Sequence, residues 1–135
     1  MEVIIHHLGN VRFEATARGH RVLCDQPFEN HGSDAGMTPP ELLLSSLGTC
    51  AGYYAAEYLR TRGLSTEGLE VRVVAEKATQ PARLASFRIE VTVPEFDERH
   101  QAGVLRAVKA CLIHNTLVNA PAIEIAISSP VPATV

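Results

Sequence analysis

Residues 38–63 constrain the fold most, because they predict one long helix that must be buried. Thr38 and Glu41 fit a capping box, and the two prolines between them occupy first-turn positions where no amide donor is needed. Two arginines and then a glycine suit the C-terminal end. No charged residue occurs from position 42 to 56, and a helix that is apolar all round is a buried helix. We therefore expect this helix to form the centre of the molecule, with Cys50 near its middle.

Length and charge narrow the class of protein. The chain has 135 residues, 46% of them hydrophobic, which is enough for one core. We expect a single domain over residues 1–135. The net charge is −3 and no basic run exceeds two residues, so no nucleic acid binding is expected. The N-terminus does not resemble a signal peptide and no apolar run is long enough to span a bilayer, so we expect no membrane association and a cytoplasmic location.

Period-two patterns predict strands on both sides of the helix. An antiparallel meander of three strands is expected over residues 3–25, including strands at 11–16 and 21–25. After the helix, residues 69–76 and 87–93 predict a hairpin with one face in water.

A second helix is expected after Asp97, which suits an N-cap. Its apolar stripe follows helical spacing and comprises Val104, Leu105, Val108, Cys111 and Leu112. The helical pattern continues to about Val118 with a break near Cys111, and residues 123–127 predict a final strand. The fold class is α+β, with helices segregated from mainly antiparallel strands.

Burial of the central helix has a consequence for assembly. A helix that is apolar all round needs cover on every side, and one small domain has few elements to supply it. We therefore expect a homodimer with the central helices at its interface.

Cys50 and Cys111 are the sharpest candidates for chemistry. They could form a dithiol in which one cysteine attacks and the other resolves, or both could be small buried residues, since free cysteine is among the most buried residue types. Cys50 lies in mid-helix and cannot use the N-terminus of its own helix to lower its pKa, so a reactive thiolate would need a cation from another element. Cys24 is expected in the core.

Glu41 has two interpretations. It completes the capping box, and it could also hold an arginine. Nine residues separate Glu41 from Cys50, which leaves half a turn between them at 100° per residue. If both serve one site, either the helix bends near residues 45–48 or Glu41 reaches the site of a second subunit.

The six histidines do not pair with cysteines at zinc-site spacing, and no Cys-x-x-Cys occurs, so no metal site is expected. His114 follows Cys111 by three residues. A cysteine hydrolase that uses Cys50 with His31 or His114 remains an alternative.

The chain resembles the OsmC/Ohr family of osmotically induced and organic hydroperoxide resistance proteins. The resemblance rests on Thr-Pro-Pro-Glu-Leu-Leu-Leu-Ser-Ser-Leu-Gly-Thr-Cys ending at Cys50, on the hairpin beyond it, and on Ala-Cys ending at Cys111. The Leu-Leu-Leu-x-x-Leu-Gly-x-Cys motif is similar to the sequences of divergent, OsmC-like branches of the family. The resemblance implies an intertwined homodimer with two sites at the subunit interface.

The resemblance also implies thiol-dependent reduction of peroxides. A pocket lined by leucines and tyrosines would favour organic hydroperoxides over hydrogen peroxide. Cys50 matches the peroxidatic cysteine, Cys111 the resolving cysteine, and Glu41 the glutamate that holds the site arginine. Arg18 is the first choice for that arginine and Arg21 the second. No bound cofactor is expected; an external dithiol, by resemblance lipoyl-type, would reduce the Cys50–Cys111 disulfide. The alternative is a non-enzymatic dimer that binds a small apolar ligand in the interface cavity.

Overall fold

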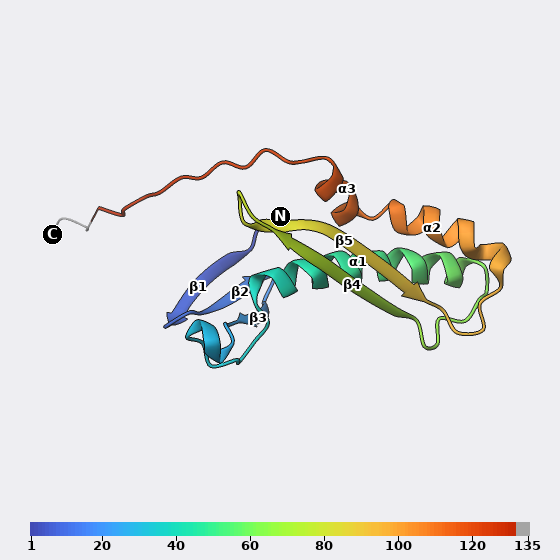
Figure 1. Ribbon diagram of the computed structural model, residues 1–135, viewed down its shortest axis with the longest axis horizontal. Coiled ribbons are helices and arrows are strands. Elements are labelled where there is room, and N and C mark those ends of the chain that lie inside the picture. Colours follow the sequence, from blue (N-terminus) through green and yellow to red (C-terminus); the bar gives the residue numbers. More distant parts are fainter. Residues whose placement is uncertain (132–135) are drawn as a thin grey trace.

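The computed structural model describes residues 1–131 and has the α+β architecture that the sequence predicts. Three antiparallel strands, a long helix, a hairpin and two short helices follow one another along the chain (Figure 1). They are β1 (Ile4–Gly9), β2 (Arg12–Ala17), β3 (His20–Cys24), α1 (Pro39–Thr61), β4 (Glu70–Ala78), β5 (Arg83–Thr92), α2 (Gln101–Lys109) and α3 (Leu112–Val118). The 3-10 turns η1 (Phe28–Asn30) and η2 (Glu98–His100) lie before α1 and α2. The predicted meander, central helix and hairpin are confirmed.

Both ends of α1 are fixed by local sequence. The Thr38 hydroxyl accepts from the Glu41 N–H at 3.5 Å, while the Glu41 carboxylate accepts from the Thr38 N–H at 3.1 Å, so the predicted capping box is present. At the other end Gly63 adopts a φ of 67°. Its N–H and that of Leu64 bond back to carbonyls of the last turn, as in a Schellman motif.

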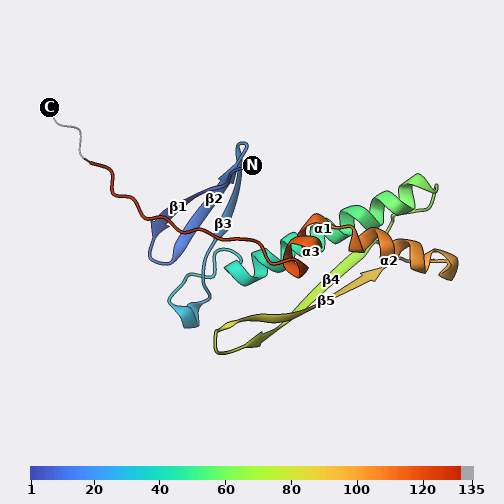
Figure 2. The same cartoon turned by 90° about the horizontal axis from the view of Figure 1, so that it is seen from above.

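The core lies where α1 packs against α2 and one face of the β4–β5 hairpin (Figure 2). Ala51, Ala55 and Leu59 of α1 form one side of it, and Val104 and Val108 of α2 the other. They recur at helical spacing, so a single stripe of each helix is buried.

The opposite side of α1 is not covered in one chain. Tyr53 on this side is 61% exposed. The expectation of a helix buried all round is therefore wrong for a single chain, because α2, α3 and the hairpin all approach α1 from one side.

The outer face of the hairpin is polar, as predicted. Glu90 of β5 lies opposite Arg72 of β4 and accepts from it at 3.3 Å, and Arg88 contacts the same carboxylate at 2.8 Å. The alternate residues face the core.

The second helical segment begins and breaks where the sequence indicates. The Asp97 carboxylate caps η2, which continues into α2. Cys111 has an extended backbone (φ −55°, ψ 129°) and separates α2 from α3. Of the predicted apolar stripe, Leu105 and Leu112 are 54% and 60% exposed, which corrects that part of the prediction.

The three-stranded sheet lies beyond the N-terminal end of α1 (Figure 1). Cross-strand register places Ile5, Ala15 and Val22 on one face, together with the neighbouring pair of Phe13 and Cys24. Ile5, Val22 and Phe13 are 56%, 47% and 38% exposed. This apolar sheet face is uncovered in the single chain.

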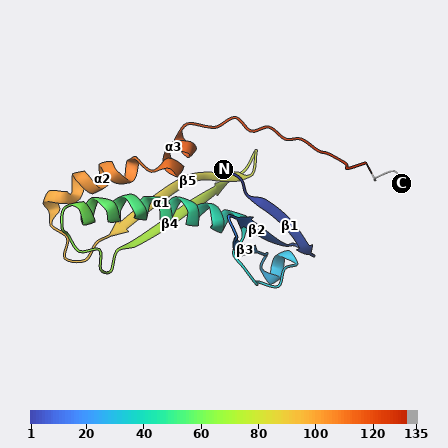
Figure 3. The ribbon, with the colours of Figure 1, turned by 180° about the vertical axis from the view of Figure 1, so that it is seen from behind.

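Residues 119–131 form an extended tail that runs away from α3 (Figure 3). The predicted strand at 123–127 is absent from the part of the chain that the structure describes, and Ile123, Ile125 and Ile127 are 80%, 87% and 95% exposed. A strand requires a neighbour for its backbone hydrogen bonds, and nothing in residues 1–131 lies beside this segment to supply one.

Candidate functional site

Cys50 and Cys111 come together although sixty-one positions separate them in sequence. Cys50 lies on α1 and is half-buried, whereas Cys111 is fully buried at the junction of α2 and α3. The two thiols lie close enough for each to shift the pKa of the other. The structure thus places the two cysteines as a thiol pair, which is the arrangement that a dithiol site requires.

The two thiols are electrostatically unequal. Burial acts to raise the pKa of Cys50, but hydrogen bonds from the Cys111 thiol and from two backbone N–H groups outweigh it, so the pKa lies below the usual value. Burial, and then the hydrogen bond to Cys50, raise the pKa of Cys111 above its usual value. The thiolate form is therefore favoured at Cys50, whereas Cys111 is held as the protonated thiol.

The first turn of α3 supplies the donors. The backbone N–H groups of Leu112 and Ile113 point their dipoles at the Cys50 sulfur and lower its pKa. The His114 N–H bonds to the Cys111 sulfur at 3.4 Å. The expectation that a cation must activate Cys50 is not met in the single chain, because peptide dipoles from a second helix take that place.

The small residues near Cys50 have a packing role. A Cβ on Gly48 would lie 2.9 Å from Cγ2 of Val73, and one on Gly52 would lie 3.4 Å from Cγ2 of Val71. The hydroxyl of Thr49 bonds back to the helix backbone at 2.7 Å. These glycines let β4 approach α1, and they do not open space around the sulfur.

An apolar groove lies between α1, β5 and α3. Neither cysteine lines it, but His114, three residues after Cys111, does. Its volume is about 510 Å³. The residues that line it include Leu43, Leu47, Phe87, Ile89, Leu117 and His114. We call it the α1–β5–α3 groove.

Glu41 does not share a site with Cys50 in one chain. Its carboxylate is bound to the N–H and hydroxyl of Thr38, at 3.1 and 2.7 Å. Those hydrogen bonds hold the pKa of Glu41 below its usual value. Since α1 is continuous from Pro39 to Thr61, the half-turn between Glu41 and Cys50 remains, and the alternative in which Glu41 reaches the site of a second subunit stays a prediction.

Neither candidate arginine reaches the thiols within the described chain. Arg18 is exposed in the β2–β3 turn with a φ of 51°, and Arg21 is exposed on β3. Among residues 1–131, neither forms an ion pair or a hydrogen bond with Cys50 or Glu41. Their assignment stays a prediction.

A buried ion pair at the start of the molecule had no sequence signal. Asp25 is 1% exposed and accepts from the N–H groups of Gln26, Ser33 and Ala35 at 2.8, 3.2 and 3.1 Å. Arg12 lies 3.6 Å from the same carboxylate. Burial raises the pKa of Asp25, but these bonds outweigh it and leave the pKa lowered. The pair fixes the loop that leads into α1.

Cys24 is half-buried on the apolar sheet face, opposite Phe13. Its predicted core position is met only in part, because that face carries no packed layer in one chain.

Within residues 1–131, no three His, Cys, Asp or Glu side chains are grouped so that they could hold a metal ion. No helix in that same range is long and apolar enough to cross a membrane.

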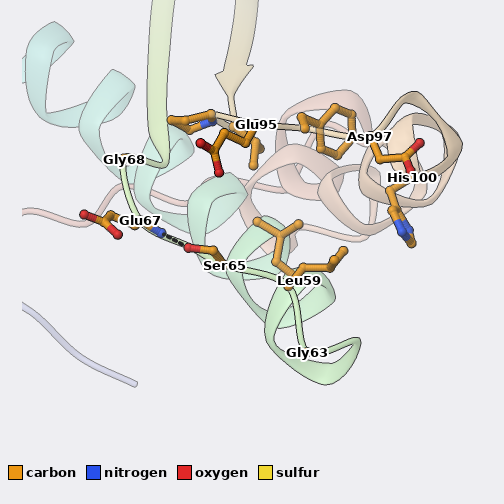
Figure 4. Close-up of a pocket in the computed structure, with 12 residues that line it drawn as sticks. Leu59, Gly63, Ser65, Glu67, Gly68, Glu95, Asp97 and His100 are labelled. Carbon is orange, nitrogen blue, oxygen red and sulfur yellow. Dashed lines mark hydrogen bonds between the residues drawn. The ribbon is translucent and has the colours of Figure 1, made fainter.

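A second hollow of about 630 Å³ lies at the far end of α1 (Figure 4). Leu59 and Phe96 contribute apolar surface, and Glu67, Glu95 and His100 contribute polar groups. Its lining residues lie at positions 59–68 and 93–100, so they include neither the cysteines nor the residues next to them in sequence.

Comparison with known proteins places the chain in a family. The family model described as OsmC-like protein matches residues 31–126. No curated protein sequence matches the chain.

Several solved structures share the fold. A putative osmotic stress induced and detoxification response protein from Psychrobacter arcticus 273-4 is 21% identical, with 84% of this chain and 85% of that chain covered and a TM-score of 0.77. An OsmC like protein from Mycoplasma pneumoniae is 18% identical, with coverage of 88% and 87% and a TM-score of 0.70. An organic hydroperoxide resistance protein OsmC from Legionella pneumophila is 14% identical, with coverage of 87% and 89% and a TM-score of 0.59. The family match over residues 31–126, together with this shared fold, shows that the chain belongs to the OsmC-like protein family.

Proposed function

We propose that the chain is a thiol-dependent peroxidase that reduces organic hydroperoxides. The observation that supports this most is the contact between Cys50 and Cys111, with the pKa of one thiol lowered and that of the other raised. Family membership supports the same class of chemistry, since one structural relative is an organic hydroperoxide resistance protein. The α1–β5–α3 groove offers apolar surface for the organic part of the substrate.

The reaction follows from the two thiols. The Cys50 thiolate attacks the distal peroxide oxygen, so that an S–O bond forms, the O–O bond breaks, and the alkoxide leaves and takes up a proton. Cys50 is then a sulfenic acid, which condenses with Cys111 to give a disulfide and water. An external dithiol reduces that disulfide by thiol exchange. By resemblance to the family, a lipoyl-type dithiol is the first reductant to test.

The proposal includes a second copy of the chain, so that the active form is a homodimer. The apolar sheet face, the outer side of α1 and the isoleucines of the tail all lack cover in one chain. A homodimer would cover them and could bring Arg18 or Arg21, and Glu41, to the thiol pair of the partner. Light scattering should then give twice the mass of one chain; a monomer would contradict this part of the proposal.

The activity test counts thiols. Reduced protein treated with one equivalent of cumene hydroperoxide should lose two thiols and yield a Cys50–Cys111 disulfide by mass analysis. Cys24→Ser serves as the matched control and should behave as the unmodified protein. The proposal fails if no such disulfide forms and Cys50→Ser leaves peroxide consumption unchanged.

A non-enzymatic role in ligand binding is the second candidate, and the volume of the α1–β5–α3 groove is the observation that favours it. A fatty acid used as probe would then raise the melting temperature. The rise would persist in Cys50→Ser/Cys111→Ser protein, which could not reduce peroxide.

A further inference from the structure

The resolving thiol poses a problem of proton transfer. Cys111 is 0% exposed, and burial raises its pKa, so it is held as a thiol. To attack a sulfenic acid on Cys50 it must lose its proton, and bulk water has no access to it. A nearby acid–base group is needed.

His114 has the position for this task. It is the third residue of α3, and its backbone N–H bonds to the Cys111 sulfur at 3.4 Å. His114 also lines the α1–β5–α3 groove. The ring nitrogen Nδ1 is buried and has no hydrogen-bond partner within residues 1–131. A buried imidazole nitrogen without a protein partner is costly to keep, and it is free to exchange a proton.

Other histidines in the described chain differ from it. His7 bonds to the Asn10 carbonyl at 2.7 Å, and His100 bonds to Tyr58 at 3.1 Å. His20 is exposed on β3. His114 alone combines an orphaned buried ring nitrogen with a main-chain bond to a reactive sulfur.

We propose that His114 is the acid–base group of the resolving step, a role that rests on the proposed peroxidase function. His114 Nδ1, which has no hydrogen-bond partner in the resting form, accepts the Cys111 proton in the resolving step. The Cys111 thiolate attacks the Cys50 sulfur, the S–S bond forms and the S–O bond breaks. His114 returns the proton to the departing hydroxide, so one water is released and the imidazole is regenerated.

The experiment separates the two steps of the reaction. Reduced protein is mixed with one equivalent of cumene hydroperoxide, and Cys50 sulfenic acid, trapped by dimedone, and the disulfide are measured over time by mass spectrometry. In His114→Gln protein, sulfenic acid should form at the normal rate, accumulate, and convert to disulfide about 10²-fold more slowly. His20→Gln should match the unmodified protein, and so should Tyr54→Phe, which removes the hydroxyl one turn beyond Cys50 on α1.

Normal disulfide formation in His114→Gln protein would overturn the assignment, as would a defect in Tyr54→Phe protein instead. If His114→Gln does not fold, the unmodified protein still decides the matter, because proton transfer in the resolving step makes disulfide formation slower in D₂O. Equal rates in H₂O and D₂O would then overturn it. Unmodified protein that consumes no peroxide would instead refute the proposed function itself.

Discussion

Gly48 gives a sharp test of how α1 packs on the hairpin. An added Cβ would lie 2.9 Å from Cγ2 of Val73, well inside the 3.5–4.0 Å at which carbon atoms attract. Val73 is β-branched and on a strand, so it has little freedom to move away. Overpacking of this kind costs about 1–3 kcal/mol. Alanine also has a helix propensity about 1 kcal/mol better than glycine. Gly48→Ala should therefore destabilise the protein by about 0–2 kcal/mol, the difference of the two effects.

Gly52 is the matched control on the same helix. Its added Cβ would lie 3.4 Å from Cγ2 of Val71, which is an ordinary contact. Gly52→Ala should keep the propensity gain and stabilise by up to about 1 kcal/mol. Urea unfolding followed by circular dichroism measures both free energies, and a common m value shows that the midpoints can be compared.

A double-mutant cycle identifies the cause. In a Val73→Ala background the crowding atom is gone, so Gly48→Ala should become neutral or stabilising, with a coupling energy of about 1 kcal/mol or more. The packing argument is refuted if Gly48→Ala stabilises the protein as much as Gly52→Ala does, or if its effect is the same with and without the Val73 side chain.

Three further outcomes are expected. Alkylation of Cys50 by iodoacetamide should reach half its maximal rate at a pH below that typical of a free thiol. Cys111→Ala, which removes a hydrogen bond to the Cys50 sulfur, should move this midpoint to higher pH, and Cys111→Ser should move it less. Thr38→Ala should lower the free energy of unfolding by about 1 kcal/mol in urea titrations, while Glu41→Gln, which keeps a capping side chain, should cost less. Because the folded-state pKa of Asp25 is lowered, its stabilising effect is complete above the unfolded-state pKa of about 4 and is lost as pH falls through the folded-state value. Asp25→Asn should therefore be less stable at neutral pH and show a weaker loss of stability below about pH 4, measured as melting temperature against pH.

Local signals were sufficient for much of the fold. Thr38 and Glu41 specify the start of α1 because a capping box involves only four consecutive residues. The break at Cys111 was also predictable from the pattern. The predicted strand at 123–127 failed because a strand is completed by its neighbour, and sequence periodicity does not supply one.

The site was predictable in its members but not in its geometry. Cys50 and Cys111 could be named from the sequence, whereas the hydrogen bonds from Leu112 and Ile113 depend on how α3 meets α1. The packing role of Gly48 had no sequence signal, because the helix sequence does not say which side faces β4. The pairing of Arg12 with Asp25 joins β2 to the loop after β3, and no spacing rule marks it.

The apolar sheet face has a consequence for how the chain folds. A small sheet that buries neither face is marginal in water, because too little apolar surface leaves the solvent to offset the ordering of three strands. If a second copy supplies the cover, residues 4–24 become ordered only on association. Dilution should then expose the amides of β1–β3 to hydrogen exchange before those of α1. The fraction of molecules in which residues 4–24 are ordered would thus depend on the protein concentration.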